Sequence, residues 1–456
     1  MAVNFDKIVK YTINSVCESN LHIGSSVGGK EEVLVHPVTG VPFIQASSIA
    51  GVFRRNYEKL YNDSDKLFGA RSMNANSNAS EFESRVKFTD GIFDNNSLKL
   101  EIRPHVRIDK VSGTVMQERG SGQKLEMEYV GQGSKFNMEV YLYIESKDKT
   151  AYEKSIESIL SLMCKGEITF GAKKSSGSGK VIPDTIYKKV FDMTNEADRK
   201  EWNRDDEKDS SKELNNGEVI YSNTENKIDS VNESNVAYTI KISGKTEGAI
   251  MVKGIAVSEF GKGAPDCENI KNAKKENIIP GTSIRGAIRA QMEKISGYIG
   301  KKMIIKSAFG NNEGTRKIGN LVFSDVKIDN EEYKKNEIIR HRIHIDKFTG
   351  GVIASELFAE KNTCGKLSIE IKIMNGITDK AETDATLGLL LLALRDLTVK
   401  NMSFGGGYSV GKGFIDVDEI TISDSEKCET FYSNGKSESS DCDFVKGALA
   451  ALREVS

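Results

Sequence analysis

The chain has 456 residues, of which 38% are hydrophobic and 29% charged, so it can form two or three domains with packed cores. Its formal net charge is −2, and its longest apolar run, residues 387–394, is too short to span a bilayer. The six cysteines lack the close spacing that is typical of zinc sites. These features exclude a membrane protein, a secreted disulfide scaffold and a disordered chain. We expect reduced thiols and, because no signal-like segment opens the chain, a cytoplasmic location.

Hydrophobic periodicity predicts alternating strands and helices in the first part of the chain. In chain order, the predicted elements are a strand at 8–16, a long loop at 20–44, a helix capped by Ser47 or Ser48 and ending near 61, a strand at 85–91, a projecting hairpin at 103–129, a strand at 135–144, a helix at 150–163 and a strand at 167–171. Without the hairpin, the order is β-α-β-β-α-β, which is ferredoxin-like. We therefore expect an α+β fold with an antiparallel sheet and helices on one face.

A second segment repeats this pattern. Seven short blocks recur in the same order, for example Ser47-Ser-Ile-Ala-Gly51 as Thr282-Ser-Ile-Arg-Gly286 and Arg107-Ile-Asp-Lys110 as His344-Ile-Asp-Lys347. The chain is therefore predicted to contain a duplicated domain. The predicted boundaries are a first domain at 1–185, an acidic connector at 186–234, a second domain at 235–423, and an acidic tail at 424–456 that could include a short helix.

Charge is partitioned along the chain. The net charge is +1 for residues 1–185, −5 for 186–234, +5 for 235–420 and −3 for 421–456. A near-neutral total argues against indiscriminate binding of nucleic acid. It remains compatible with a basic face on each domain, because the acidic groups gather in the connector and the tail.

Three sets of residues recur in both copies and are candidates for contact with an RNA backbone. They lie in two Gly-rich loops, at two helix starts and in two hairpins. The candidates are Lys173, Lys174 and Lys412 in the loops; Ser47, Ser48, Arg54, Arg55, Ser283, Arg285 and Arg289 at the helix starts; and Arg103, Arg107, Lys110, Arg340, Arg342 and Lys347 in the hairpins. Glycines let backbone N–H groups approach a phosphate, and helix starts carry positive potential. The alternatives are a flexible turn, ordinary capping and a solvated hairpin.

Acidic residues in the long loops are the candidates for catalysis. A loop aspartate facing RNA could take a proton from a 2′-hydroxyl or hold a divalent metal. The first copy offers Lys30-Glu-Glu32 in this loop, and the second offers Asp266 and Glu268. By itself this signal is weak, since most loop aspartates are solvated. No histidine is placed like a member of a ribonuclease pair, and a structural role is expected for His22.

The ordered motifs resemble a known family. Leu21-His-Ile-Gly24, His36-Pro-Val-Thr-Gly-Val-Pro42 and Ser47-Ser-Ile-Ala-Gly51, with the Ile-Asp-Lys-x-x-Gly hairpins and the late Gly-rich loops, resemble the RAMP-superfamily backbone subunits of type III CRISPR effector complexes. These are the Csm- and Cmr-type "Cas seven" proteins. The tandem arrangement resembles the fused double-backbone subunit of type III-D systems.

The resemblance implies two tandem RAMP domains of ferredoxin type, each with a thumb hairpin, here 103–129 and 340–358. It implies binding of CRISPR RNA and cleavage of complementary target RNA by a loop aspartate. Counting back from Pro280-Gly281 places that residue at Asp266, whereas the same count in the first copy reaches Lys30. The implied activity is an endoribonuclease that uses Mg²⁺ or Mn²⁺, with no zinc site.

The implied partners are CRISPR RNA, complementary target RNA, adjacent backbone subunits, a large polymerase-like subunit and small subunits, with no membrane. Three other functions remain open. The chain could be a scaffold that holds guide RNA without cutting, a guide-processing ribonuclease, or a metabolic enzyme with duplicated ferredoxin-like halves. A change at Asp266 separates target cleavage from the scaffold function, because only a nuclease would lose a cut.

Overall fold

The structure is a computed structural model. It describes residues 5–25, 32–61, 63–69, 83–109, 115–118, 121–122, 124–145, 151–205, 217–223, 234–254, 265–311, 317–329, 337–353, 358–375, 379–434 and 442–455. The chain divides into two compact units. Unit 1 is Met1–Leu100, Glu128–Lys174 and Ser178–Ser234; unit 2 is Glu101–Met127, Ser175–Gly177 and Asn235–Ser456. Two segments of the first sequence repeat therefore belong to the second unit.

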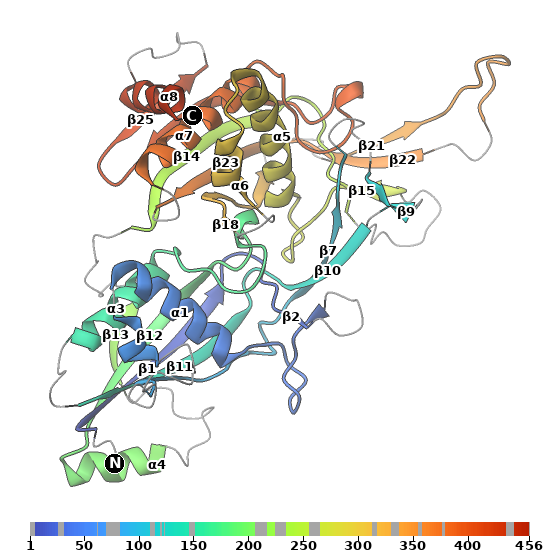
Figure 1. Ribbon diagram of the computed structural model, residues 1–456. Helices are drawn as coiled ribbons and strands as arrows, with labels where there is room; N and C mark the ends of the chain where they lie inside the picture. Colours follow the sequence, from blue (N-terminus) through green and yellow to red (C-terminus); the bar gives the residue numbers. More distant parts are fainter. Residues whose placement is uncertain are drawn as a thin grey trace. The chain divides into compact units, whose positions relative to one another are not determined.

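Unit 1 is built on an antiparallel sheet with α1 and α3 on one face (Figure 1). Its elements are β1 Lys7–Cys17, β2 Gly24–Ser25, β3 Glu32–Val33, β4 Phe43–Ile44, α1 Ala46–Leu60, α2 Ser64–Phe68, β5 Val86–Phe88, β6 Gly91–Phe93, β11 Lys135–Ile144, α3 Ala151–Cys164, β12 Val181–Asp192, α4 Glu196–Asp205 and β13 Glu218–Ser222. The strand order is β13-β12-β1-β11-β6-β4, with β5 also on β11. This order is ferredoxin-like, as the sequence predicts, because β1 lies between the last strand and β11.

Unit 2 repeats this arrangement. Its main elements are β14 Val236–Thr246, β15 Cys267–Glu268, β16 Ile278–Ile279, α5 Gly281–Ile299, α6 Met303–Phe309, β17 Gly310–Asn311, β18 Lys317–Ile318, β19 Leu321–Phe323, β20 Val326–Asp329, β23 Lys366–Met374, α7 Lys380–Thr398, β24 Ile415–Ser423, β25 Cys428–Ser433 and α8 Asp443–Glu454. The strand order is β16-β20-β23-β14-β24-β25, with β19 also on β23. The α+β class and the ferredoxin-like topology are therefore confirmed in both repeats.

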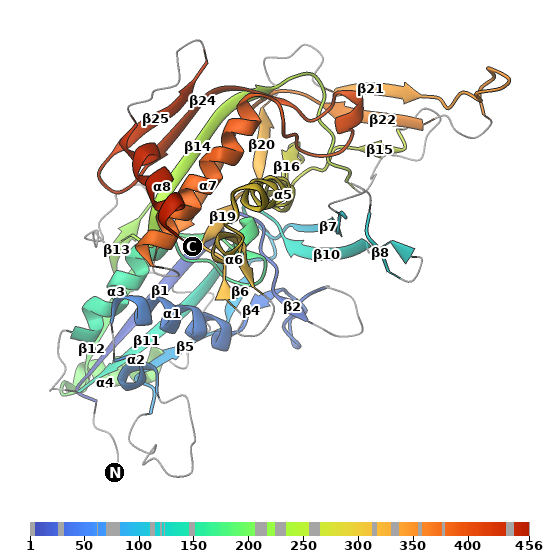
Figure 2. The same ribbon diagram turned by 45° about the horizontal axis from the view of Figure 1, so that its top comes forward.

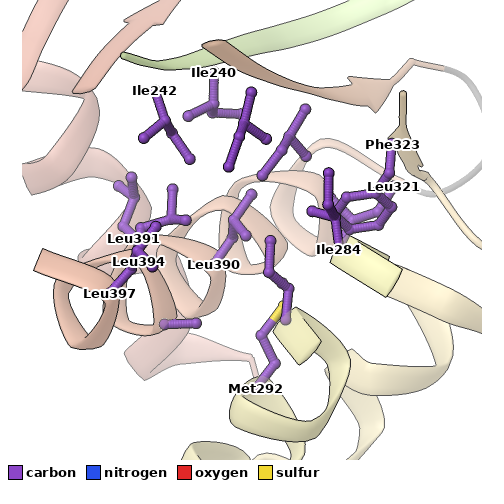
Figure 3. Packing of buried hydrophobic residues seen from close by; sticks show 14 of the residues in the cluster. Ile240, Ile242, Ile284, Met292, Leu321, Phe323, Leu390, Leu391, Leu394 and Leu397 are labelled. Atoms are coloured by element: carbon purple, nitrogen blue, oxygen red, sulfur yellow. The ribbon is translucent and has the colours of Figure 1, made fainter. Parts of the chain in front are cut away.

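Each sheet has its own apolar core because alternate residues of its strands face the helices. In β14, Ile240 and Ile242 point toward α7, where Leu390 and Leu394 lie on the facing side (Figure 3). These four side chains are fully buried. Asp379 caps α7, since its Oδ1 accepts a 2.7 Å hydrogen bond from the Glu382 backbone N–H. The helix is thus fixed both by burial and at its start.

A hairpin rises from each repeat between its second and third strands of the ferredoxin order. The first, β7 Leu100–Val106 with β10 Lys124–Val130, also carries the short strands β8 Gln117–Glu118 and β9 Ser121–Gly122. The second pairs β21 Glu337–Arg342 with β22 Phe358–Thr363 and extends away from the sheet of unit 2 (Figure 2). The first hairpin lies close to the predicted 103–129, whereas the second extends beyond the predicted 340–358 at both ends, because its strands are Glu337–Arg342 and Phe358–Thr363.

The segment predicted as an acidic connector holds more structure than the sequence indicates. The last strand of the first sheet, β12, pairs with β1 from Cys17–Val181 to Lys7–Asp192 and so follows the Gly-rich loop, whereas the sequence predicted a strand before that loop. Next, α4 places Trp202 against Phe191, with ring centroids 5.2 Å apart. The sequence analysis missed these elements because the segment has few apolar residues, and many charged residues lie between them. Within the described part of the chain, no helix is both long and apolar enough to cross a membrane.

The tail contributes to the core of unit 2. In this tail, β25 extends the sheet along β24, and α8 lies where the sequence predicts a short helix. The buried residues Ala448 and Leu452 of α8 face α7. A Cβ added to Gly388 of α7 would lie 2.5 Å from the Ala448 carbonyl oxygen, so glycine permits this close helix contact.

Candidate nucleic-acid interface

The helix starts are capped by carboxylates, and the predicted serine caps are absent. Asp90 accepts a 2.7 Å hydrogen bond from Ala46 N at the start of α1. Asp325 accepts a 2.8 Å bond from Gly281 N at the start of α5. Each of these aspartates lies two residues after the end of a matching strand, β5 in the first repeat and β19 in the second. Ser47 and Ser48 make no capping bond and are exposed in the first turn of α1, while Ser283 is half-buried in α5.

Unit 1 brings three cationic side chains together. Arg55 and Lys59 lie one turn apart on α1, and Lys174 begins a short 3-10 helix, η3 Lys174–Ser176, in the Gly-rich loop. Burial and the charges of Arg55 and Lys59 lower the pKa of Lys174 to about 8. Partial burial and Arg55 also lower the pKa of Lys59, which nearby Glu167 partly offsets. Cations that act on one another in this way form an electrostatic site for a polyanion.

The arginines of the matching helix in unit 2, α5, contact an aromatic ring and hydrogen-bond acceptors. The guanidinium groups of Arg285 and Arg289 lie over the Phe309 ring, at 5.3 and 5.5 Å from its centroid. Arg285 donates to the Phe309 carbonyl oxygen at 2.9 Å, and Arg289 donates to Glu293 at 2.8 Å. In unit 1, Arg54 similarly pairs with Glu58 and Asp65. The contacts of these arginines within the protein therefore stabilise the packing of their helices without a ligand.

The Gly-rich loops use their backbone N–H groups internally. Phe170 N donates to Gly179 O at 2.8 Å, and Gly179 N donates to Asn20 O at 2.7 Å. The second repeat has the same bonds, with Phe404 and Gly413 in the matching places. A Cβ on Gly179 would lie 1.9 Å from the Phe170 carbonyl oxygen. The glycines are thus explained by close backbone packing, and the amides named here cannot also cradle a phosphate. The side chain of Lys173 remains exposed.

Lys412 is enclosed within unit 2. It is 3% exposed, forms an ion pair with Glu360, and donates to Asn362 Oδ1 at 2.9 Å. Arg342 reaches the same carboxylate at 3.2 Å from the exposed side. We therefore assign Lys412 to the support of the second hairpin and remove it from the RNA contacts that we propose.

Arg103 is also engaged within unit 2. It is 5% exposed, its Nη1 lies 2.5 Å from Asp325 Oδ2, and its Nε lies 2.7 Å from Glu101 Oε1. Because two carboxylates surround it, the pKa of the guanidinium is raised despite burial. Asp325 thus accepts a hydrogen bond from the start of α5 and also pairs with Arg103 of the first hairpin. Like Lys412, Arg103 is unavailable to RNA in this arrangement.

The distal part of the second hairpin is exposed and ordered by a turn. Asp346 Oδ1 accepts hydrogen bonds from Phe348 N at 2.9 Å and Thr349 N at 2.7 Å, and these bonds lower the pKa of its carboxyl group. Phe348 is 98% exposed beside the exposed Lys347. A cation next to an apolar ring suits contact with nucleotides. Arg107 and Arg340 are also exposed, and Lys110 lies outside the described residues.

Asp266 is exposed and held by the second hairpin. Its backbone N donates to Ala359 O at 2.8 Å, and its Oδ2 accepts from Ala359 N at 2.6 Å. Among the described residues, none donates to Oδ1. The pKa of the neighbouring Cys267 thiol is raised by burial, and the charges of Lys253, Glu360, Lys412 and Asp266 also act on it. Asp266 therefore lies in a strongly charged neighbourhood with one oxygen available.

Matching hydrogen bonds relate this loop to the first repeat. Leu34 N donates to Ile23 O at 2.7 Å, and Ile270 N donates to Val252 O at 2.8 Å. Counting along the sequence from Leu34 and Ile270 aligns position 30 with Asp266, as the earlier count does, and Lys30 lies outside the described residues. No group of three His, Cys, Asp or Glu residues in the described ranges could hold a metal ion. The described residues do not form a resident metal centre around Asp266.

Sequence reasoning missed two cations of this interface. Lys59 belongs to the cluster of unit 1, and helical spacing of four from Arg55 was the available signal. Lys253 is exposed near Asp266, with its Nζ 5.1 Å from the Phe358 ring centroid. Its position depends on a hairpin strand about a hundred residues later, so no local pattern could reveal it. His22 has the structural role expected, since it is buried with Nδ1 2.7 Å from Glu128 O.

Comparison with known proteins gives one family. The RAMP superfamily profile matches residues 16–182 and again 252–416, so both repeats are covered. A search of curated proteins found no match.

Proposed function

Because the chain belongs to the RAMP superfamily, whose members bind CRISPR RNA and other effector subunits, we propose that it is a cytoplasmic backbone subunit of a type III CRISPR effector complex. In this proposal the protein binds CRISPR RNA and cleaves complementary target RNA with Asp266. The observation that carries the proposal is the family match in each of the two repeats. The tandem arrangement supports a fused double-backbone subunit.

The cation cluster of unit 1 supports the RNA-binding part of the proposal. Arg55 and Lys59 come from α1 and Lys174 from η3. Burial and the charges of the two α1 side chains lower the pKa of Lys174. A phosphate between them would replace this repulsion by attraction, and the release of counterions would add affinity. Such contacts read the backbone and leave the sequence to guide pairing.

The geometry at Asp266 supports a role in proton transfer. Ala359 fixes one carboxylate oxygen, so the other keeps a defined direction toward solvent. With a target nucleotide placed there, this oxygen would accept the proton of the 2′-hydroxyl. The 2′-oxygen would attack the adjacent phosphorus, and the bond to the 5′-oxygen of the next nucleotide would break. The 5′-oxygen would take a proton from water, leaving a 2′,3′-cyclic phosphate and a 5′-hydroxyl.

We keep the predicted Mg²⁺ or Mn²⁺ requirement as part of the proposal, but route no step through an ion. Asp266 is a single carboxylate ligand, and the described residues add no cluster that would complete a site. A scaffold that holds guide RNA and never cuts is the second candidate. It is favoured by the same cation cluster, which serves binding with or without cleavage.

The proposal is tested with the full chain assembled with CRISPR RNA and its neighbouring subunits. Complementary and scrambled target RNAs, each end-labelled, are incubated with and without magnesium and resolved on a denaturing gel. We expect cleavage of the complementary RNA alone, with cyclic phosphate ends. Equal treatment of both RNAs would contradict guided cleavage, and failure to retain CRISPR RNA would contradict the backbone role.

A further inference from the structure

The sheet of unit 1 has a second face, on the side away from α1 and α3. Residues that pair across an antiparallel ladder point their side chains to the same side, and adjacent residues alternate. Lys10 of β1 pairs with Tyr141 of β11 and Lys189 of β12, and both neighbours of Lys10 along β1 are core residues. Lys87 of β5 also pairs with Tyr141. We name these four residues, together with Phe191 two positions after Lys189, the back face.

Aromatic rings and lysines lie side by side on the back face. The Nζ atoms of Lys10 and Lys87 are 5.6 and 5.7 Å from the centroid of the Tyr141 ring. The Nζ atom of Lys189 is 5.0 Å from the centroid of the Phe191 ring. Aromatic rings on a sheet face stack bases, and lysines beside them pair with phosphates, which is how several RNA-binding modules hold a single strand. The composition of the back face therefore suits single-stranded nucleic acid.

The matching face of unit 2 has a different composition. Its residue pairs between β14 and β23 are Thr239–Lys372, Lys241–Glu370 and Ser243–Ser368. These side chains are polar or charged, and Lys372 and Glu370 form an ion pair at 3.3 Å. The rings of the back face are therefore not explained by the fold that the two repeats share.

Helix α4 covers the back face with one aromatic side chain. The Trp202 ring lies edge-on to Phe191 and Tyr141, with centroids 5.2 and 5.7 Å apart and interplanar angles of 71° and 81°. Phe191 is fully buried, although it lies outside the core cluster of unit 1. Apart from one alanine, the other side chains of α4 are polar or charged. A helix of this length is marginal by itself, so its position depends on few contacts.

The charges around α4 follow the same division. On the sheet, Glu139 Oε1 lies 3.1 Å from Lys10 Nζ. From α4, Glu201 Oε1 accepts a 2.9 Å hydrogen bond from Lys189 Nζ. If α4 left the sheet, Lys189 would lose this partner and could attract a phosphate.

We propose that the back face is a second nucleic-acid site, which binds a short single-stranded segment, and that α4 closes it. Trp202 stands where a base would stack, and Glu201 stands where a phosphate would reach Lys189. A strand that binds must displace α4, so the docking of α4 lowers the apparent affinity. The inference goes beyond the proposed function and does not depend on it, because α1, which carries two cations of the guide-binding cluster, covers the opposite face.

The test uses the emission of Trp202, the single tryptophan of the chain. The full-length protein, without guide RNA, is titrated with an oligouridine RNA of about eight nucleotides and, separately, with the matching oligothymidine DNA. We expect the emission to shift to longer wavelength and to saturate, because the indole leaves the sheet for water. The nucleic acid that gives the tighter response is the ligand class of the site.

Three variants measure the same displacement as an affinity, with labelled oligonucleotide. Trp202→Ala should bind about tenfold more tightly, because the back face is then open. Adding Tyr141→Ala should remove this gain, because a base loses the ring on which it stacks. Lys200→Gln changes an exposed side chain of α4 and should leave both the affinity and the emission shift as in wild type.

The proposal is overturned if the emission shift or the tighter binding of Trp202→Ala is missing. It is also overturned if the gain survives Tyr141→Ala, because the strand then binds elsewhere. If other subunits of the effector complex shift the emission without nucleic acid and the oligonucleotides do not, the face contacts protein and the proposal fails. Retention of CRISPR RNA by wild type is measured separately, and its loss would overturn the proposed function alone.

Discussion

The two repeats share one topology, but their basic residues have different surroundings. Those of the first repeat lie near one another, whereas those of the second contact an aromatic ring or a carboxylate. In unit 1, burial and the charges of Arg55 and Lys59 lower the pKa of Lys174. In unit 2, the helix arginines rest on Phe309 and Lys412 is enclosed by Glu360 and Asn362. The exposed loop carboxylate, Asp266, belongs to the second repeat, and the first has Lys30 at the matching position. In the proposed function, this difference assigns the holding of RNA to the first repeat and the cleavage step to the second.

The largest expected effect on stability is a difference between substitutions of Arg103 and Arg340, which occupy matching positions in the two hairpins. Arg103→Ala leaves the enclosed Glu101 carboxylate and the half-buried Asp325 carboxylate without their cation, which should lower the free energy of unfolding by about 3–5 kcal/mol. Arg340→Ala, the matched control, removes an exposed side chain and should change it by less than about 0.5 kcal/mol. Chemical denaturation measures both. Equal losses would contradict the burial of Arg103 between Asp325 and Glu101.

A smaller difference in stability is expected between alanine substitutions at the two loop glycines, Gly177 and Gly411. Gly177 and Gly411 have φ of 81° and 75°, so alanine strains the backbone similarly at both. At Gly177 the new Cβ also meets backbone atoms, which should destabilise Gly177→Ala by about 1–3 kcal/mol more than Gly411→Ala. Thermal unfolding of the two variants gives the difference. Indistinguishable midpoints would show that the first loop is not packed as described.

The cation cluster should contribute one phosphate contact per side chain. Lys174→Gln should weaken binding of CRISPR RNA and reduce the slope of log affinity against log salt by about one. Lys200→Gln, an exposed change on α4, serves as control and should leave the slope unaltered. Filter binding at several salt concentrations measures this. An unchanged slope for Lys174→Gln would remove the residue from the interface.

The same residue predicts a pH dependence. Below pH 8, Lys174 carries its proton in the free protein, so RNA binding requires no proton uptake. Above pH 8 the free protein loses that proton, whereas a bound phosphate favours keeping it. Affinity should therefore fall by up to about tenfold per pH unit between pH 8 and about 10. In Lys174→Gln this fall should disappear; a fall of the same size would assign it to another group.

The sequence predicted the duplication, the ferredoxin-like order and both hairpins, because each depends on local periodicity and on repeated motifs. The prediction failed where a residue's contacts are made with residues far away in the sequence. The helix starts looked like serine caps, but Asp90 and Asp325 reach them from other strands. Lys412 looked like a phosphate ligand, yet Glu360 encloses it from the second hairpin. The glycines of the loops were correctly found, but close backbone packing explains them.

The site was predicted in part for the same reason. Arg55 and Lys174 were both candidates, and their proximity required the fold to bring α1 beside the Gly-rich loop. Arg103 was a candidate for RNA contact because basic residues recur in the two predicted hairpins. Its burial follows from ion pairs with Asp325 and Glu101, and Asp325 lies too far away in the sequence for a local pattern to reveal the contact.

The most direct test of the division between the repeats is target cleavage by Asp266→Asn in the assembled complex, beside the exposed control Asp418→Asn. Labelled complementary RNA and magnesium are added, and products are resolved while RNA affinity is measured in parallel. We predict that Asp266→Asn loses one product band and keeps its affinity for RNA, and that Asp418→Asn keeps every band. Persistence of all bands in Asp266→Asn would contradict the account and leave this chain as a guide-holding scaffold.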